Sequence, residues 1–196
     1  MAQAARGRQT QIEIVRTGGR LFAAHGYHYT SMTDILQAVA VSKGGFYYHF
    51  RSKQDLALAV LNLAQTEYKH QFFDPVAATT RRAGRLATLL ERSVELHESG
   101  QWHYCLLLTR LAQEMGRQEG QLAEQVATTV NWLIGCWEEC VHDARTDGVI
   151  RDDLDPRVLA ELIVSMLFGA VSCRELDDGA IHLKRIIGQI QLMIAP

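Results

Sequence analysis

Residues 31–53 read SMTDILQAVAVSKGGFYYHFRSK, and this stretch sets the fold class of the chain. In its first part the apolar residues recur with the spacing of one helical face, at Met32, Ile35, Leu36 and Val39. Ser31 stands before this run and Asp34 follows three residues later, the pattern of a capping box with Asp where Glu is usual. We therefore predict a helix that is capped at Ser31 and ends near Val39.

A second, shorter helix is predicted after Ser42, whose side chain can cap it and whose position leaves free amides suited to a phosphate. Phe46 and Phe50 are four residues apart, so both can turn inward and anchor this helix. Gly44 and Gly45 are poor helix formers, which favours a backbone that another surface approaches closely. The other residues supply hydrogen-bond donors and flat rings: Lys43, Tyr47, Tyr48 and His49. Two helices of this kind, joined by a short turn, predict a helix-turn-helix that docks in the DNA major groove.

The stretch also resembles the DNA-binding segment of TetR-family regulators, whose usual form is close to T-x-x-D-I-A-x-x-A-G-V-S-K-G-x-x-Y-x-H-F-x-S-K. The matching positions are Thr30, Asp34, Ile35, Val41, Ser42, Lys43, Gly44, Tyr47, His49, Phe50, Ser52 and Lys53. Leu36 departs from the pattern, as do Val39 and Ala40, which stand where Ala-Gly is usual. If the turn is left-handed at Ala40, the missing Gly costs on the order of 1 kcal/mol.

Together the residues and the resemblance predict a DNA-binding surface of ten residues. They are Thr30, Ser31, Ser42, Lys43, Gly44, Gly45, Tyr47, Tyr48, His49 and Lys53. The resemblance implies that Thr30, Tyr47 and Lys53 contact phosphates, so their loss should weaken binding to every sequence. Changes at Lys43, Gly45 and Tyr48 should instead alter the sequence preference.

The composition agrees with a cytoplasmic regulator. The 196 residues carry a net charge of −2, but residues 1–55 hold seven Lys or Arg against three acids. That basic front end precedes an acidic remainder, which is typical of a DNA reader with a separate regulatory body, although ordinary surface variation is the simpler alternative. No run approaches the roughly 18 apolar residues of a membrane helix, so no membrane association is expected. Four irregularly spaced cysteines are expected to be reduced thiols.

The chain is predicted to be all-α, with about nine helices in two domains. Residues 1–52 would form a three-helix helix-turn-helix domain, and residues 53–196 a helical ligand-binding and dimerisation domain. A linking helix is expected over residues 53–73, ended by Asp74–Pro75. Asp155–Pro156 marks a later helix start.

The last two predicted helices, residues 156–175 and 179–194, are candidates for a homodimer interface. The first has almost no polar face, and a helix that is apolar all round must be buried on both sides. The TetR resemblance implies a dimer through a four-helix bundle of this C-terminal pair. A twofold dimer predicts a palindromic double-stranded DNA operator. The alternative is that both helices fill the core of a monomer.

Aromatic and thiol residues of the body suggest the walls of a pocket for a small-molecule inducer. The predicted ligand-binding residues are Trp102, Tyr104, Cys105, Leu108, Trp132, Cys136 and Phe168. Ordinary core packing is the alternative for each of them. Cys136, Cys140 and His142 provide too few ligands for a zinc site, and no metal or cofactor is predicted.

Cys105 allows a second interpretation, because it lies near a predicted helix start, where the helix dipole favours a thiolate. The segment HYCLLLTRLAQEM resembles the TetR branch that includes regulators of the NemR and AcuR type, some of which respond to electrophiles through a cysteine. Two alternatives to a ligand-released repressor therefore stay open. One is a cysteine-based redox or electrophile sensor, and the other is a helical enzyme or binding protein with an incidental helix-turn-helix. The sequence has no activated nucleophile or phosphate loop that would indicate an enzyme.

Overall fold

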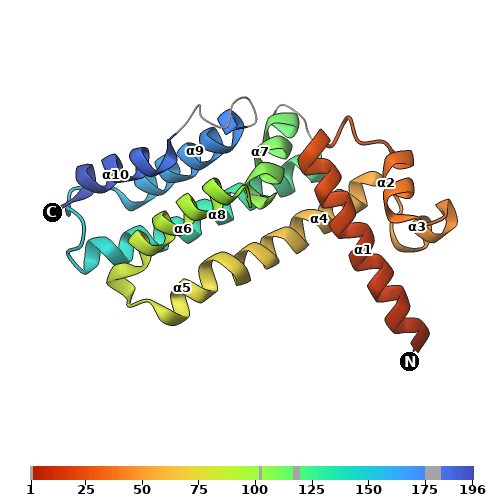
Figure 1. Cartoon of the computed structure of the whole chain (residues 1–196), viewed down its shortest axis with the longest axis horizontal. Coiled ribbons are helices and arrows are strands. Elements are labelled where there is room, and N and C mark those ends of the chain that lie inside the picture. Colours follow the sequence, from red (N-terminus) through yellow and green to blue (C-terminus); the bar gives the residue numbers. More distant parts are fainter. Residues whose placement is uncertain (1, 102, 117–119, 175–181) are drawn as a thin grey trace. The chain divides into compact units, whose positions relative to one another are not determined.

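The computed structural model describes residues 2–101, 103–116, 120–174 and 182–196, and over these ranges it contains helices and no strand (Figure 1). The all-α prediction is therefore confirmed. The chain forms two compact units, the first from Met1–Thr66 with Leu107–Thr129 and the second from Glu67–Leu106 with Val130–Pro196. The division into domains at residue 52 stays a prediction.

The elements follow one another without a long irregular loop among the described residues. The first unit holds α1 (Ala2–His25), α2 (Met32–Val39), α3 (Lys43–His49), most of α4 (Lys53–Tyr68), the end of α7 (His103–Met115) and the start of α8 (Gln121–Thr146). The second holds a π-helical turn (Lys69–Phe73), α5 (Asp74–Thr79), a 3-10 turn (Arg82–Gly84), α6 (Arg85–Ser99), the rest of α7 and α8, α9 (Pro156–Arg174) and α10 (Leu183–Ile194). If α4, the π turn and α5 are taken as one run, the described residues form nine helical runs, the number predicted.

The helix after Lys53 does not stop at Asp74–Pro75, and this part of the prediction is wrong. A π-helical turn inserts one extra residue, and the Asp74 amide donates to the carbonyl of Lys69 five residues back. Pro75 lies in the first turn of α5 and has no N–H to donate, and the carbonyl of Gln71 four residues before it accepts instead from the Arg92 Nη2 at 2.7 Å. The helical run therefore continues to Thr79.

Close packing of α1 against α4 forms the core of the first unit. Ile14 and Phe22 of α1 and Leu56 of α4 are fully buried. Gly18 faces Leu56, and a Cβ atom added at Gly18 would lie 2.9 Å from the Leu56 Cδ2. A side chain at Gly18 would therefore require the Leu56 side chain to shift.

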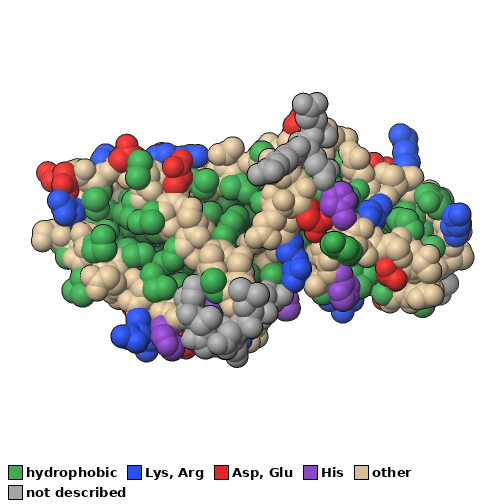
Figure 2. Space-filling model, turned by 90° about the horizontal axis from the view of Figure 1, so that it is seen from above, with side chains coloured by type: hydrophobic (Ala, Val, Ile, Leu, Met, Phe, Trp, Pro, Cys, Tyr) green, Lys and Arg blue, Asp and Glu red, His purple; other side chains and the backbone are tan. Residues whose placement is uncertain are grey.

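The C-terminal helices of the second unit leave apolar side chains exposed. Buried residues line the inner side of α10 at Leu183, Ile187, Ile190 and Ile194. The exposed apolar residues of α9 and α10, called the C-terminal patch below, are Val158, Leu162, Ile186, Leu192 and Met193. Hydrophobic side chains gather over this part of the second unit (Figure 2). By length and composition α9 is also long and apolar enough to cross a membrane, a property that it shares with buried core helices of soluble proteins.

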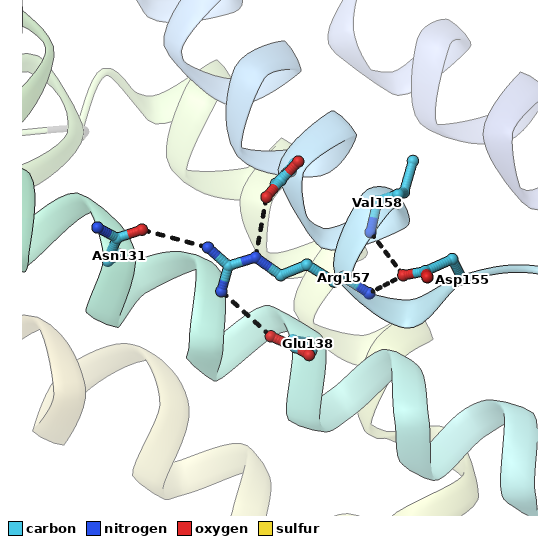
Figure 3. A network of polar contacts seen from close by, with 6 residues as sticks. Asn131, Glu138, Asp155, Arg157 and Val158 are labelled. Carbon is cyan, nitrogen blue, oxygen red and sulfur yellow. Dashed lines mark hydrogen bonds and ion pairs between the residues drawn. The ribbon is translucent and has the colours of Figure 1, made fainter.

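Asp155 begins α9, as the sequence predicts. Its Oδ1 accepts from the backbone N–H groups of Arg157 at 2.8 Å and Val158 at 3.1 Å, which satisfies two free donors of the helix start (Figure 3). The Arg157 guanidinium then reaches α8, where Nη1 lies 3.2 Å from Glu138 Oε2 and Nη2 lies 3.2 Å from Asn131 Oδ1 (Figure 3). These contacts fix the start of α9 on α8.

The turn between α2 and α3 is left-handed at Ala40, with φ of 57°. The amide of Ala40 donates to the carbonyl of Gln37 at 3.2 Å, and that of Val41 donates to Leu36 at 3.3 Å. These two bonds form a Schellman motif, in which Gly is the residue usually found at the left-handed position. Ala40 is the one non-glycine residue with positive φ in the part of the chain described.

We predict that Ala40→Gly raises the free energy of unfolding by about 0.5–1 kcal/mol, because Gly adopts this backbone angle without the strain of a Cβ. Urea unfolding at a fixed protein concentration measures the change. The matched control is Ala38→Gly in the exposed interior of α2, which should lower the same quantity by about 1 kcal/mol. A loss of stability in both variants would contradict a strained turn.

Candidate nucleic-acid interface

Caps and two buried rings hold the short helix α3. The Ser42 Oγ accepts from the Gly45 amide at 3.1 Å, so Ser42 caps α3 as predicted. Phe46 is fully buried, Phe50 nearly so, and their ring centroids are 5.7 Å apart. The prediction that both rings turn inward is confirmed, and it leaves the opposite face of α3 free.

That opposite face carries the side chains expected to meet DNA. Lys43 and Tyr47 are exposed, and the Tyr48 side chain is 83% exposed. His49 is half-buried, and its ring packs edge-on against Tyr48 at 4.9 Å. Two tyrosine rings and an ammonium group therefore project from one short helix, although the Tyr47 ring also packs edge-on against Phe46, with centroids 5.4 Å apart.

The two glycines of α3 have no role in packing the protein itself. A Cβ added at Gly44 would meet no atom within 4 Å, and one at Gly45 would lie 3.4 Å from the Ser42 Oγ. Both residues have helical backbone angles, so neither needs the conformational freedom of glycine. Each still weakens the helix by about 1 kcal/mol relative to Ala.

A capping box starts α2, as predicted. The Asp34 amide donates to the Ser31 Oγ at 3.1 Å, and the Ser31 amide donates to the Asp34 Oδ2 at 2.8 Å. Hydrogen bonding of the Asp34 carboxyl to the side chain of Ser31, and then to its backbone, lowers the pKa of that carboxyl. Ser31 itself stays exposed at the helix start.

Thr30 and Lys53 support the turn before α2 through their side chains. Thr30 is 1% exposed, and its hydroxyl donates to the Gly26 carbonyl at 2.7 Å. The hydroxyl is therefore used inside the protein, and a phosphate contact of Thr30 stays a prediction. The half-buried Lys53 Nζ donates to the carbonyls of Tyr27 at 2.9 Å and Thr30 at 3.0 Å. Desolvation lowers the pKa of Lys53.

In the second unit, two predicted ligand residues, Tyr104 and Trp132, belong to a cluster of aromatic rings. Its members, called the aromatic cluster below, are Tyr68, Phe72, Phe73, Tyr104, Trp132 and Trp137. Tyr68 lies at the centre, stacked on Tyr104 with centroids 4.3 Å apart and on Phe72 at 4.8 Å. The hydroxyl of Tyr104 and the indole nitrogen of Trp137 are buried without a hydrogen-bond partner among the described residues.

The other predicted ligand residues fall in different places. Cys136 is half-buried, and its charge would raise the pKa of Tyr104, an effect smaller than that of burial. Phe168 is half-buried on α9 and has no ring contact with the cluster in the described structure. Leu108 is buried and belongs to the first unit. Trp102 lies outside the described residues.

The structure does not favour the alternative of a thiolate at Cys105. Cys105 is fully buried in the first turn of α7, and burial raises the pKa of its thiol to about 12. The thiol lies 3.9 Å from the Tyr68 hydroxyl and donates to it. Desolvation thus outweighs the helix dipole on which the sequence argument relied. Burial likewise raises the pKa of Cys136 to about 11.

The sequence analysis missed three rings of the aromatic cluster and one exposed ring. Tyr68, Phe72 and Phe73 converge through the π turn, which no pattern in the sequence announces. Tyr29 is 86% exposed in the turn that precedes α2. In the sequence, an aromatic residue directly before the predicted helix-turn-helix is the signal that could have drawn attention to Tyr29.

A capped recognition helix with a free polar and aromatic face, preceded by a capped helix and a tight turn, defines a helix-turn-helix DNA-binding protein. The chain matches the family described as "Bacterial regulatory proteins, tetR family" over residues 14–60. It also matches "Tetracyclin repressor-like, C-terminal domain" over residues 83–190. The protein belongs to the TetR family of transcriptional regulators.

Relatives of this family align over most of the chain. The regulator UidR of Escherichia coli is 22% identical over 169 residues, which cover 86% of this chain and 83% of UidR. The regulator AcuR of Cereibacter sphaeroides is 26% identical over 156 residues, 76% of this chain and 68% of AcuR. Among solved structures, AibR in complex with isovaleryl coenzyme A and operator DNA has a TM-score of 0.74 at 23% identity, covering 95% of this chain and 98% of that one.

We predict that Cys105 of the native protein resists alkylation. A pKa of about 12 in place of 9.0 lowers the thiolate fraction at pH 8 about a thousandfold. Mass spectrometry after iodoacetamide treatment measures the modification of Cys105, and the same protein unfolded in urea is the control. Equal rates in the folded and unfolded protein would contradict a buried, protonated thiol.

Proposed function

We propose that this TetR-family regulator is a homodimeric repressor that reads a palindromic operator with α3 and leaves the DNA when a small molecule binds its second unit. Gly44 and Gly45 carry this proposal. They weaken α3, yet the protein has room for a side chain at both positions. The absence of side chains at Gly44 and Gly45 therefore allows an external surface to come close to the backbone of α3.

DNA fits that surface better than a protein partner does. The first 55 residues carry a net charge of +4, whereas the chain as a whole carries −2. The exposed residues of α3 include a lysine and two tyrosines, which can donate to phosphates and base edges, and no acidic residue. We assign the sequence preference to Lys43, Gly45 and Tyr48. We assign the phosphate contacts to Tyr47 and Ser42.

Further contacts flank α3 on its N-terminal side. Ser31 is exposed at the start of α2, and Tyr29 projects from the preceding turn. We add Tyr29 to the proposed phosphate contacts. Lys53 and Thr30 act mainly by holding this turn, because their polar atoms bond to the backbone there.

The C-terminal patch supports dimerisation. Val158 and Leu162 are more than half exposed on α9, as are Leu192 and Met193 on α10. Contiguous apolar surface of this kind marks an interface. A second copy of the chain would cover it and would also explain why α9 has so few polar residues. Twofold symmetry then requires two half-sites about one helical turn apart.

The aromatic cluster supports an effector site. A buried donor without a partner costs about 1–3 kcal/mol, and Tyr104 and Trp137 each present one. We assign the effector contacts to Tyr104, Trp132, Cys136 and the neighbouring rings. A small molecule with an apolar part and a hydrogen-bond acceptor would pair these donors. The solved AibR complex contains both a coenzyme A thioester and DNA, which supports control by a small molecule.

Control by ligand is favoured over control by cysteine chemistry. The thiolate of Cys105 is suppressed by burial, and Cys136 and Cys140 have raised pKa values as well. The relatives are regulators, which agrees with a protein that is not an enzyme. A cytoplasmic location follows from the proposed action on DNA.

We predict that Gly44→Ala has opposite effects on stability and on DNA binding. The free energy of unfolding should rise by up to about 1 kcal/mol, because Ala favours the helix. The affinity for a duplex selected by the wild-type protein from a random library should fall at least about tenfold, because the new methyl group holds the DNA away. Fluorescence anisotropy at two salt concentrations measures the affinity.

The matched control is Gly135→Ala in α8, which also has open space around its Cβ position. It should gain stability and keep its DNA affinity. Unchanged DNA binding by Gly44→Ala would remove the observation on which the proposal stands. Failure of the wild-type protein to select any palindromic, salt-sensitive site would overturn the proposal itself.

We predict that Leu162→Glu separates the dimer into monomers, because the substitution places a charge in an interface that must be desolvated. Light scattering after size-exclusion chromatography measures the molecular mass. Val149→Glu, another exposed apolar residue outside α9 and α10, is the control and should leave the mass unchanged. Two variants with identical mass would argue against the C-terminal patch as the interface.

A further inference from the structure

The turn between α1 and α2 is held by a carboxylate that comes from a distant part of the chain. Glu114 lies in the last turn of α7, within the first unit. Its Oε1 accepts from the Tyr27 amide at 2.9 Å, and its Oε2 accepts from the His28 amide at 2.8 Å. Both oxygens of one carboxylate therefore bind consecutive backbone N–H groups of the turn.

The local backbone is shaped to admit this carboxylate. Gly26 ends α1 with φ of 88°, and a Cβ atom added there would collide with the Glu114 Oε1. Any other residue at position 26 would therefore meet both backbone strain and a clash with Glu114. Gly26 serves the approach of Glu114 as well as the end of the helix.

A lysine holds the same turn by its carbonyl groups. The Lys53 Nζ donates to Tyr27 and Thr30 and lies 4.3 Å from the centroid of the Tyr27 ring. The negative charge of Glu114 acts to raise the pKa of Lys53, against the stronger effect of desolvation. The Glu114 carboxylate on two amides and the Lys53 ammonium group on two carbonyls thus hold four backbone groups of Tyr27, His28 and Thr30.

This turn determines where α2 begins, and α2 leads through the tight turn at Ala40 into α3. Two charge-assisted hydrogen bonds to the two oxygens of one carboxylate fix orientation as well as distance. The amide of His28 is on the exposed side of the turn, so water can replace the carboxylate if Glu114 is lost. Loss of Glu114 is then expected to affect orientation more than stability.

We propose that Glu114 is a positioning residue for DNA recognition, contributed to the helix-turn-helix by α7. It contacts no DNA itself and acts through the backbone of Tyr27 and His28. The inference rests on the proposed function, because a correctly placed α3 matters only if α3 reads DNA. The end of α7 would then be part of the structure that supports the helix-turn-helix.

The test compares Glu114→Ala, Glu114→Gln and a control, Glu124→Gln. Glu124 is exposed on α8 in the same unit, and its change removes the same charge. Hydrogen exchange of the Tyr27 and His28 amides is measured by NMR without DNA. Affinities for the duplex selected by the wild-type protein and for a random duplex are measured by fluorescence anisotropy.

In Glu114→Ala, exchange at both amides should become roughly tenfold faster, while core amides of α1 keep their rates. Affinity for the selected duplex should fall about tenfold, with a smaller change for random DNA. Glu114→Gln keeps one acceptor oxygen and should lie between wild type and Ala in both measurements. A defect of global stability would instead accelerate the core amides as well.

Unchanged exchange at Tyr27 and His28 in Glu114→Ala would overturn the inference. So would a loss of affinity in Glu124→Gln equal to that in Glu114→Gln, since charge alone would then account for it. Wild-type protein that binds no selected duplex would refute the proposed function. It would leave the contact of Glu114 with the two amides untouched, because the amide exchange is measured without DNA. If Glu114→Ala does not fold, the Gln variant decides between these outcomes by the same two measurements.

Discussion

A helix of seven residues has no stability of its own in water, because nucleation costs more than so few hydrogen bonds return. Everything that α3 does therefore depends on the burial of Phe46 and Phe50 beneath it. These two rings hold one side of the helix in place, so the residues on its other side are not needed to anchor it. Only under that constraint can a helix carry two glycines and a face of exposed tyrosines.

Features that depend on neighbours within about four residues could be read from the sequence. The capping box of Ser31 and Asp34, the cap at Ser42 and the start of α9 at Asp155 all use groups close together in the chain. For these caps local geometry alone is sufficient, and the predictions were correct. The sequence analysis left the hand of the turn at Ala40 open, and the structure shows it to be left-handed.

Features that depend on tertiary neighbours could not be read in the same way. The burial of Cys105 beside Tyr68 depends on a helix far away in sequence, and it disfavours the thiolate that the sequence left open. The π turn that gathers Tyr68 with other rings has no sequence rule, and it carries the helix past Pro75. The contact of Glu114 with Tyr27 joins residues 87 positions apart. No periodicity connects such a pair.

The first unit is built from two distant segments of the chain, so the order of synthesis affects when it can fold. Its residues are Met1–Thr66 and Leu107–Thr129, so a nascent chain makes the recognition helix well before it makes the last segment of the same unit. Contacts between distant segments form late, because the intervening chain must first be closed into a loop. The DNA-reading end is thus expected to mature only after about two-thirds of the protein has left the ribosome. An incomplete polypeptide released earlier would carry the motif without a finished fold around it.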